Sequence, residues 1–182
     1  MRTTLVTGGV RSGKSVFAEA LLADAGPVTY ITPGYPPDPA RDPEWAARVL
    51  NHQKRRPKHW HTVETVDIAA AIAAADTPVL IDCIGTWLTR SIDAWDTWEQ
   101  PFDSWRHLFD DAVLDLLDSW RIHPHTLVAV TNEVGWGLVS QYPSGRLFAD
   151  LMGRVNHRLG AASDDVVLMV AGRALHLGPP PA

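Results

Sequence analysis

The segment from Gly8 to Ser15, GGVRSGKS, has the residue types and spacing of a phosphate-binding loop. It fits G-x-x-x-x-G-K-[ST] and lies between an apolar strand pattern and a helix pattern, as this motif requires. Its glycines let successive backbone N–H groups point at phosphate oxygens, Lys14 adds a positive charge, and the Ser15 hydroxyl can hold Mg²⁺. A glycine-rich turn without a ligand is the alternative. We expect a nucleoside triphosphate to contact every residue of the motif: Gly8, Gly9, Val10, Arg11, Ser12, Gly13, Lys14 and Ser15.

Asp82 is a second candidate for the same site. It ends the segment Val79–Asp82, whose first three residues are apolar and predict a buried strand. A carboxylate at this position can act on Mg²⁺ directly or through water, so we expect Ser15 and Asp82 to be the metal ligands. The alternative is a carboxylate that only caps a turn. These residues predict binding of Mg²⁺ and a nucleoside triphosphate, but they do not name a second substrate.

A cationic cluster follows His52. Four of the five residues from 54 to 58 are Lys or Arg in a chain that is acidic overall. Guanidinium groups can grip phosphate oxygens in a planar, bidentate way, and an imidazole can be a nucleophile or a general base near pH 7. A solvated charged loop with surface histidines is the alternative. A zinc site is a poor interpretation of His59 and His61, because no third and fourth ligands lie nearby.

Alternating strand and helix patterns must position these residues. The expected strands cover residues 5–7, 28–31, 79–82 and 127–131, and the expected helices cover residues 15–23, 44–52, 68–75, 102–120 and 146–162. Five prolines between residues 33 and 43 predict an extended loop. A hairpin over residues 166–177 would add an antiparallel edge strand near the C-terminus. The pattern predicts an α/β fold, a three-layer P-loop domain with a mostly parallel sheet, in a single domain over residues 1–182.

Composition excludes several classes of protein. The 182 residues are 46% hydrophobic, which is enough for a core, and the formal net charge of −5 disfavours a nucleic-acid binder. No apolar run reaches the roughly 18 residues of a membrane span. Cys83 is the single cysteine, so an internal disulfide is excluded. The first residues run straight into the glycine loop and leave no room for a signal peptide, so we expect a cytoplasmic protein.

Four segments, taken together, resemble one enzyme family. They are GGVRSGKS at 8–15, HQKRRP with WHTVE across 52–64, VTNEVG at 130–135 and GRVNHRL at 153–159. In this order, from residue 3 to about 177, they are similar to the bifunctional adenosylcobinamide kinase / adenosylcobinamide-phosphate guanylyltransferase of cobalamin biosynthesis. The resemblance implies a RecA-like P-loop enzyme that phosphorylates the aminopropanol hydroxyl of adenosylcobinamide with ATP or GTP. GMP then passes from GTP through a guanylylated histidine, to give adenosylcobinamide-GDP.

The resemblance also assigns residues and partners. His52 matches the guanylylated histidine, so His52 and Lys14 are the expected catalytic residues, with Mg²⁺ as cofactor. Nucleotide contacts beyond the loop are implied for Gln53, Lys54, Arg55, Arg56, Glu64 and Asp82. Gln53 departs from the Arg that the family often has at this position. The implied partners are adenosylcobinamide, its phosphate, and GTP or ATP, in a homo-oligomer that the resemblance suggests is a trimer.

Some alternatives stay open. The chain could be a plain small-molecule P-loop kinase without guanylyl transfer, or a non-catalytic nucleotide sensor. The tryptophans of the acidic segment 93–105 could face a corrin ring, although a position in the core or in an interface between subunits is favoured. Glu133 could orient a water or hydroxyl, or could close a hydrogen-bond network. We expect Cys83 to be a small buried residue rather than a nucleophile.

Overall fold

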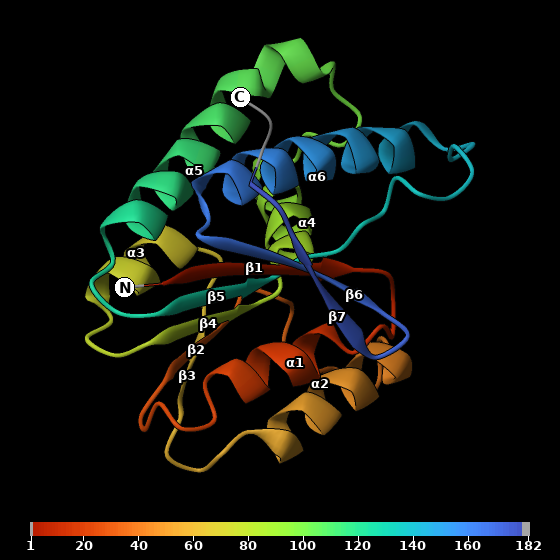
Figure 1. Cartoon of the computed structure of the whole chain (residues 1–182). Helices are drawn as coiled ribbons and strands as arrows, with labels where there is room; N and C mark the ends of the chain where they lie inside the picture. Colours follow the sequence, from red (N-terminus) through yellow and green to blue (C-terminus); the bar gives the residue numbers. More distant parts are fainter. Residues whose placement is uncertain (1, 180–182) are drawn as a thin grey trace.

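The computed structural model describes residues 2–179 (Figure 1). Within these residues, seven strands form one sheet in the order β3-β2-β4-β5-β1-β6-β7. The strands are β1 (Thr3–Gly8), β2 (Thr29–Thr32), β3 (His61–Glu64), β4 (Val79–Asp82), β5 (Leu127–Val130), β6 (Asp165–Val170) and β7 (Arg173–Leu177). All neighbouring pairs are parallel except β6 and β7, which are antiparallel. The expected mostly parallel sheet with an antiparallel edge near the C-terminus is therefore confirmed.

Helices cover both faces of this sheet, which gives the expected three layers. They are α1 (Lys14–Leu21), α2 (Pro43–Arg55), α3 (Ile68–Ala74), α4 (Ile84–Trp95), α5 (Phe102–Ile122) and α6 (Pro143–Ala162). Figure 1 shows α1 and α2 on one face and α4, α5 and α6 on the other. Among residues 2–179, we find no helix whose length and apolar character would let it cross a membrane.

Two cores follow from the alternation of side chains along the strands. Successive strand residues point to opposite faces of the sheet, so Leu5 packs in the core beneath α4, α5 and α6, whereas Val6 packs beneath α1. Parallel strands that are covered on both faces are apolar at every position. This explains why Val79, Leu80 and Ile81 are all fully buried.

Two elements were not expected from the sequence. The edge strand β3 pairs only with β2, and its residues are exposed or half-buried, so it lacks an apolar pattern. Helix α4 begins two residues after β4, with Cys83 as its N-cap, and no turn signal separates the two elements. In addition, α2 continues to Arg55, so His52 lies in the last turn of a helix.

The tryptophans of segment 93–105 confirm the favoured core interpretation. Trp105 is only 2% exposed, and its ring centroid lies 4.9 Å from that of Phe102 and 6.0 Å from that of Trp95. Trp95 and Trp98 are half-buried and pack against the same core. The edge-to-face contact of Trp105 with Phe102 is a favoured aromatic arrangement.

The carboxyl ends of the parallel strands lie at one edge of the sheet. The phosphate-binding loop leaves β1 at this edge, Asp82 ends β4, and Asn132 follows β5. In open α/β sheets, ligands bind in the crevice outside these strand ends. The fold therefore brings together, at one edge, residues that are far apart in the sequence.

Candidate active site

The phosphate-binding loop depends on two glycines with unusual backbone angles. Gly8 has a φ of +145°, and a Cβ there would overlap the carbonyl oxygen of Met169. Gly13 has a φ of +98° and caps the N-terminus of α1. The first N–H groups of a helix have no partner within the helix, and its positive end favours anions. The loop and the start of α1 can therefore bind phosphate oxygens.

Lys14 is held inside this loop. Its Nζ donates to the carbonyl oxygen of Gly9 at 2.7 Å, and the residue is only 7% exposed. Burial lowers the pKa of Lys14, while the neighbouring Cys83, Asp82 and Glu133 groups oppose this shift. A buried ammonium in this position can serve as a fixed charge for a bound phosphate.

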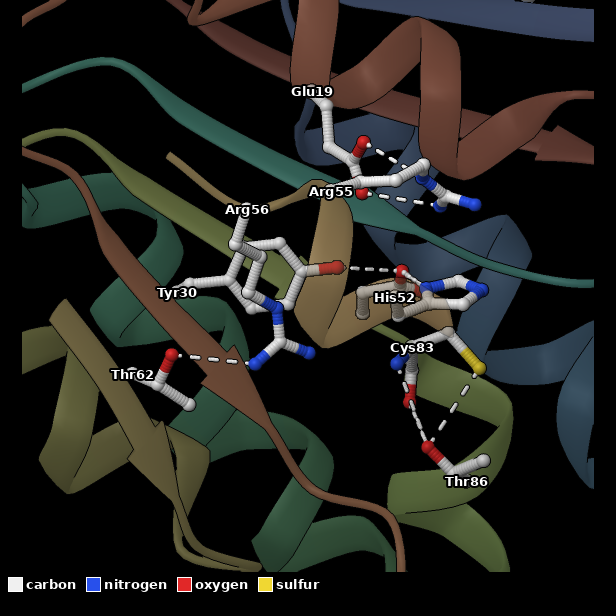
Figure 2. Close-up of polar contacts among 9 residues, drawn as sticks. Glu19, Tyr30, His52, Arg55, Arg56, Thr62, Cys83 and Thr86 are labelled. Atoms are coloured by element: carbon white, nitrogen blue, oxygen red, sulfur yellow. Dashed lines mark hydrogen bonds and ion pairs between the residues drawn. The ribbon is translucent and has the colours of Figure 1, made fainter. Parts of the chain in front are cut away.

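His52 reaches across to the end of β4. Its Nδ1 lies 3.2 Å from Oδ2 of Asp82, and the side chains are 31% and 10% exposed, respectively. Tyr30, in β2, donates its hydroxyl to the same Oδ2 at 2.8 Å. Figure 2 shows the side chains of Tyr30 and His52 pointing toward each other. Three elements therefore meet at one oxygen atom.

The pKa of Asp82 reflects these partners. Burial alone would raise its pKa, but the hydrogen bond and charge of His52 and the hydrogen bonds of Tyr30 and Ser15 together hold it below the ordinary value. For Tyr30, burial and the charge of Asp82 raise the pKa well above the ordinary value. At neutral pH, Asp82 is thus a carboxylate and Tyr30 keeps its proton.

Two arginines at the end of α2 have protein partners. Arg55 pairs with Glu19 of α1 at 3.3 Å. Arg56 lies with its guanidinium carbon 3.9 Å from the centre of the Tyr30 ring, and it donates to the Thr62 hydroxyl at 3.2 Å. Figure 2 shows both arginines near His52. A cation over an aromatic face is an attractive arrangement, so Arg56 is fixed by two contacts.

The carboxylates of Glu19 and Asp82 lie close to the His52 imidazole. Ligand atoms of Glu19, His52 and Asp82 lie within 4.8 Å of one another, a spacing that could hold a metal ion. Ser15 and Asp82 line the same cavity. Hydroxyl and carboxylate oxygens are the ligands that Mg²⁺ prefers, so the donor set near Ser15 suits this ion.

A cavity of about 540 Å³ joins the loop and α2. The expected site residues that line it are Val10, Arg11, Ser12, Gly13, Lys14, Ser15, His52, Gln53, Arg55, Arg56, Glu64 and Asp82. The expected contact residues Gly8, Gly9 and Lys54 are not among its lining. Lys54 is exposed on α2, so its role as a nucleotide ligand stays a prediction without support from its position.

Sequence reasoning missed two residues of this site. Glu19 lies one turn after Ser15 on α1. Tyr30 is an aromatic residue with a hydroxyl group, inside the buried strand β2. Both are recognisable as residue types that can do chemistry, but only the fold shows their partners. The signal that could have found Tyr30 is its hydroxyl, because a buried tyrosine usually has a hydrogen-bond partner.

Glu133 takes part in a hydrogen-bond network. Its Oε1 accepts from the Thr7 hydroxyl at 2.8 Å and from the Asn156 amide at 3.2 Å, and that amide also donates to the Asn132 carbonyl at 3.0 Å. The geometry agrees with the network role that the sequence left open. Cys83 is half-buried, and burial raises the pKa of its thiol, which disfavours the thiolate.

Comparison with known proteins identifies relatives of nearly the whole chain. The family model for cobinamide kinase / cobinamide phosphate guanyltransferase matches residues 4–177. The bifunctional adenosylcobalamin biosynthesis protein CobU of Salmonella typhimurium is 40% identical, over 92% of this chain and 95% of the relative. Its namesake in Escherichia coli is 36% identical, with the same coverage.

Two further proteins are more distant. The bifunctional adenosylcobalamin biosynthesis protein CobP of Pseudomonas aeruginosa is 34% identical, over 95% of each chain. A solved structure of the P4 protein from bacteriophage phi6 in complex with ADP has a TM-score of 0.42 and 16% identity, covering 96% of this chain and 54% of that chain. On the family match and the three bacterial relatives, the chain belongs to the cobinamide kinase / cobinamide phosphate guanyltransferase family of enzymes.

Proposed function

We propose that this chain, as a single domain, phosphorylates the aminopropanol hydroxyl of adenosylcobinamide and then transfers GMP from GTP to the new phosphate. The product is adenosylcobinamide-GDP. The observation that carries the proposal is that His52 lines the same cavity as the phosphate-binding loop. A kinase needs the loop, but only a nucleotidyl transfer through the protein needs a nucleophile beside it.

In the first reaction, the loop holds the triphosphate of ATP or GTP. Backbone N–H groups at the start of α1 and the Nζ of Lys14 bind the phosphates. The substrate hydroxyl attacks the γ-phosphorus, the bond from that phosphorus to the β-phosphate oxygen breaks, and the nucleoside diphosphate leaves. Catalysis here is positioning and charge stabilisation, since the chain itself forms no bond to the phosphoryl group.

In the second reaction, the His52 imidazole attacks the α-phosphorus of GTP. A nitrogen–phosphorus bond forms, the bond to the β-phosphate oxygen breaks, and pyrophosphate leaves with the electron pair. The phosphate of adenosylcobinamide phosphate then attacks the same phosphorus and releases the imidazole. Arg55 and Arg56 lie beside His52, where they can offset the charge that accumulates on the α-phosphate.

Ser15 and Asp82 would hold Mg²⁺, directly or through water, during these reactions. Their fit rests on the position of the hydroxyl and the carboxylate in one cavity and on the preference of Mg²⁺ for oxygen. When bound, the ion neutralises charge on the phosphates. The contribution of the chain is to keep both oxygen ligands next to the loop, where Lys14 also lies.

Labelling with GTP that is radioactive at the α-phosphate tests the proposal. Wild type should take a label that survives denaturation and is lost in acid, and His52→Ala should take none while it still phosphorylates cobinamide. His59→Ala is the matched control, because His59 is exposed nearby and does not line the cavity; it should label like wild type. Absence of label on wild type would leave the plain kinase, and nucleotide binding without turnover of cobinamide would favour the sensor.

We also propose that the chain forms a homotrimer in the cytoplasm. The support in this chain is the loop between β5 and α6, where Trp136, Leu138 and Val139 are 68%, 101% and 83% exposed. Clustered exposed apolar side chains are typical of interaction surfaces. Sedimentation equilibrium should give about three times the 20.0 kDa mass of the chain, and a monomer at micromolar concentration would contradict the trimer. Cell fractionation tests the location.

A further inference from the structure

We propose that Tyr30 and Asp82 are positioning residues, which fix His52 so that its Nε2, and not its Nδ1, receives GMP. The inference rests on the proposed guanylyl transfer and adds the identity of the reacting atom. Its basis is the convergence of the Tyr30 hydroxyl, at 2.8 Å, and the His52 Nδ1, at 3.2 Å, on Oδ2 of Asp82.

The protons in this group follow from what each atom can do. An ionised carboxylate only accepts hydrogen bonds, and a tyrosine that keeps its proton can donate one. Nδ1 of His52 must therefore carry a hydrogen to bond Oδ2 of Asp82. A neutral imidazole has one N–H, so the lone pair is on Nε2.

The carboxylate itself is firmly held. Asp82 ends a central strand, where its side chain is 10% exposed. Tyr30 is fully buried, with Arg56 3.9 Å from its ring centre and the Trp60 ring 6.1 Å away. Arg56 is in turn bonded to Thr62 of β3. The sheet thus determines where Oδ2 lies, because strands β2, β3 and β4 are adjacent.

His52 needs such an external partner. Helix α2 buries only Ala46 completely, and the His52 side chain is 31% exposed. Packing of α2 alone does not select a ring orientation, since a half-buried imidazole at a helix surface can turn about its side-chain bonds. The bond to Asp82 does select one, because it ties Nδ1 to the sheet and leaves Nε2 as the nitrogen with the free electron pair.

The electron and proton balance of the step then follows. The Nε2 lone pair forms the bond to the α-phosphorus of GTP, and pyrophosphate leaves with the electrons of the broken P–O bond. Nδ1 keeps its hydrogen, so the ring becomes a cation whose N–H faces the Asp82 carboxylate. In the transfer to adenosylcobinamide phosphate, the N–P bond breaks, and its electron pair returns to Nε2.

The bonding nitrogen can be measured on the whole protein. The full chain, with ¹⁵N-labelled histidine, is treated with GTP and Mg²⁺, and the ¹⁵N spectrum is read for coupling to ³¹P. We expect coupling at Nε2 of His52, with the hydrogen on Nδ1. Coupling at Nδ1 would overturn the inference and leave guanylyl transfer intact. Absence of any histidine–phosphorus bond would overturn the proposed function and the inference with it.

A second experiment tests Tyr30 as a positioning residue. Tyr30→Phe keeps the contacts of the ring with Arg56 and Trp60 but removes the hydrogen bond to Asp82. We expect kcat for guanylylation of the protein to fall roughly 10- to 100-fold, with KM for GTP unchanged. Tyr142→Phe, an exposed tyrosine on another loop, is the control and should match wild type. An unchanged kcat in Tyr30→Phe would overturn the role of Tyr30, and the nitrogen assignment above does not depend on whether this variant folds.

Discussion

Oδ2 of Asp82 lies 3.2 Å from Nδ1 of His52, although the two residues are 30 positions apart and belong to a central strand and to a surface helix. Asp82 and Ser15 of the phosphate-binding loop also line the same cavity. The carboxylate that contacts His52 thus lines the same cavity as the loop that we propose for the kinase reaction. We therefore expect the two proposed reactions to use one cavity in this chain rather than two separate sites.

Replacement of Lys14 tests this shared site. Lys14→Ala removes the buried ammonium that donates to Gly9, and both reactions need the triphosphate at the loop. We expect both phosphorylation of cobinamide and guanylylation of the protein to fall by about 100-fold or more, as for the loss of a preorganised charged donor.

Initial rates with labelled ATP and GTP measure this effect. Lys58→Ala is the matched control, because Lys58 is exposed and does not line the cavity, and both of its rates should equal those of wild type. If Lys14→Ala lost only one of the two reactions, the triphosphates would have to bind at different places, contrary to a shared site.

Arg56 should contribute to stability as well as to transfer. Its guanidinium lies over the Tyr30 ring and bonds Thr62, and the point charge of a lysine cannot reproduce this planar contact. Arg56→Lys should lower the free energy of unfolding by about 1 kcal/mol, measured by urea denaturation. Arg121→Lys, at an exposed pair with Asp118, should change it by less than about 0.5 kcal/mol. Equal effects of the two variants would mean that the stacked geometry contributes nothing.

Most of the fold could be predicted because its signals are local. Buried parallel strands such as Val79–Asp82 are apolar at every position, and the glycine loop marks the boundary between β1 and α1. The edge strand β3 was missed because only one face of it contacts the core, so its four residues lack a distinctive pattern. Helix α4 was missed because it follows β4 without a glycine or proline to mark the boundary.

The site could be predicted as a set of residue types, but not as a set of contacts. Phosphate binding by Gly8–Ser15 follows from a short motif, and His52 was singled out with its cations. The partners of these groups are distant in sequence: Tyr30 bonds Asp82 across 52 positions, and Arg55 pairs with Glu19 across 36. Only the order of strands and helices brings such pairs together, so no local pattern could indicate them.

The core role of Trp105 predicts a large loss of stability on truncation. Trp105 is 2% exposed and contacts both Phe102 and Trp95. Trp105→Ala should lower the free energy of unfolding by about 3–5 kcal/mol. Ile122→Ala, at a residue that is 74% exposed at the end of α5, should change it by about 0.5 kcal/mol or less. Urea denaturation of both variants measures the difference, and a small effect at Trp105 would contradict its place in the core.

A buried histidine away from the site should make stability depend on pH. His123 is 3% exposed, and its Nε2 lies 3.1 Å from the Thr77 carbonyl oxygen. Burial lowers the pKa of His123, and the nearby His125 lowers it further, although the Thr77 carbonyl opposes the shift. As pH falls below the ordinary value of about 6.5, the unfolded chain takes up this proton more readily than the folded chain. Stability should therefore fall from about pH 6.5 downward, and this contribution should level off once the pH is below the folded pKa.

His123→Gln separates this contribution from the other titrating groups. Glutamine can still donate to the Thr77 carbonyl but does not titrate, so the loss of unfolding free energy between pH 7.5 and 5.5 (pH values chosen to span about 6.5) should be smaller than in wild type. His107→Gln is the control, because His107 is exposed on α5, and its pH dependence should match that of wild type. Urea denaturation at each pH gives the change of unfolding free energy with pH for wild type and for the two variants. If His123→Gln kept the slope of wild type, the buried imidazole would not be the group responsible, because removing its titration would have left the proton uptake on unfolding unchanged.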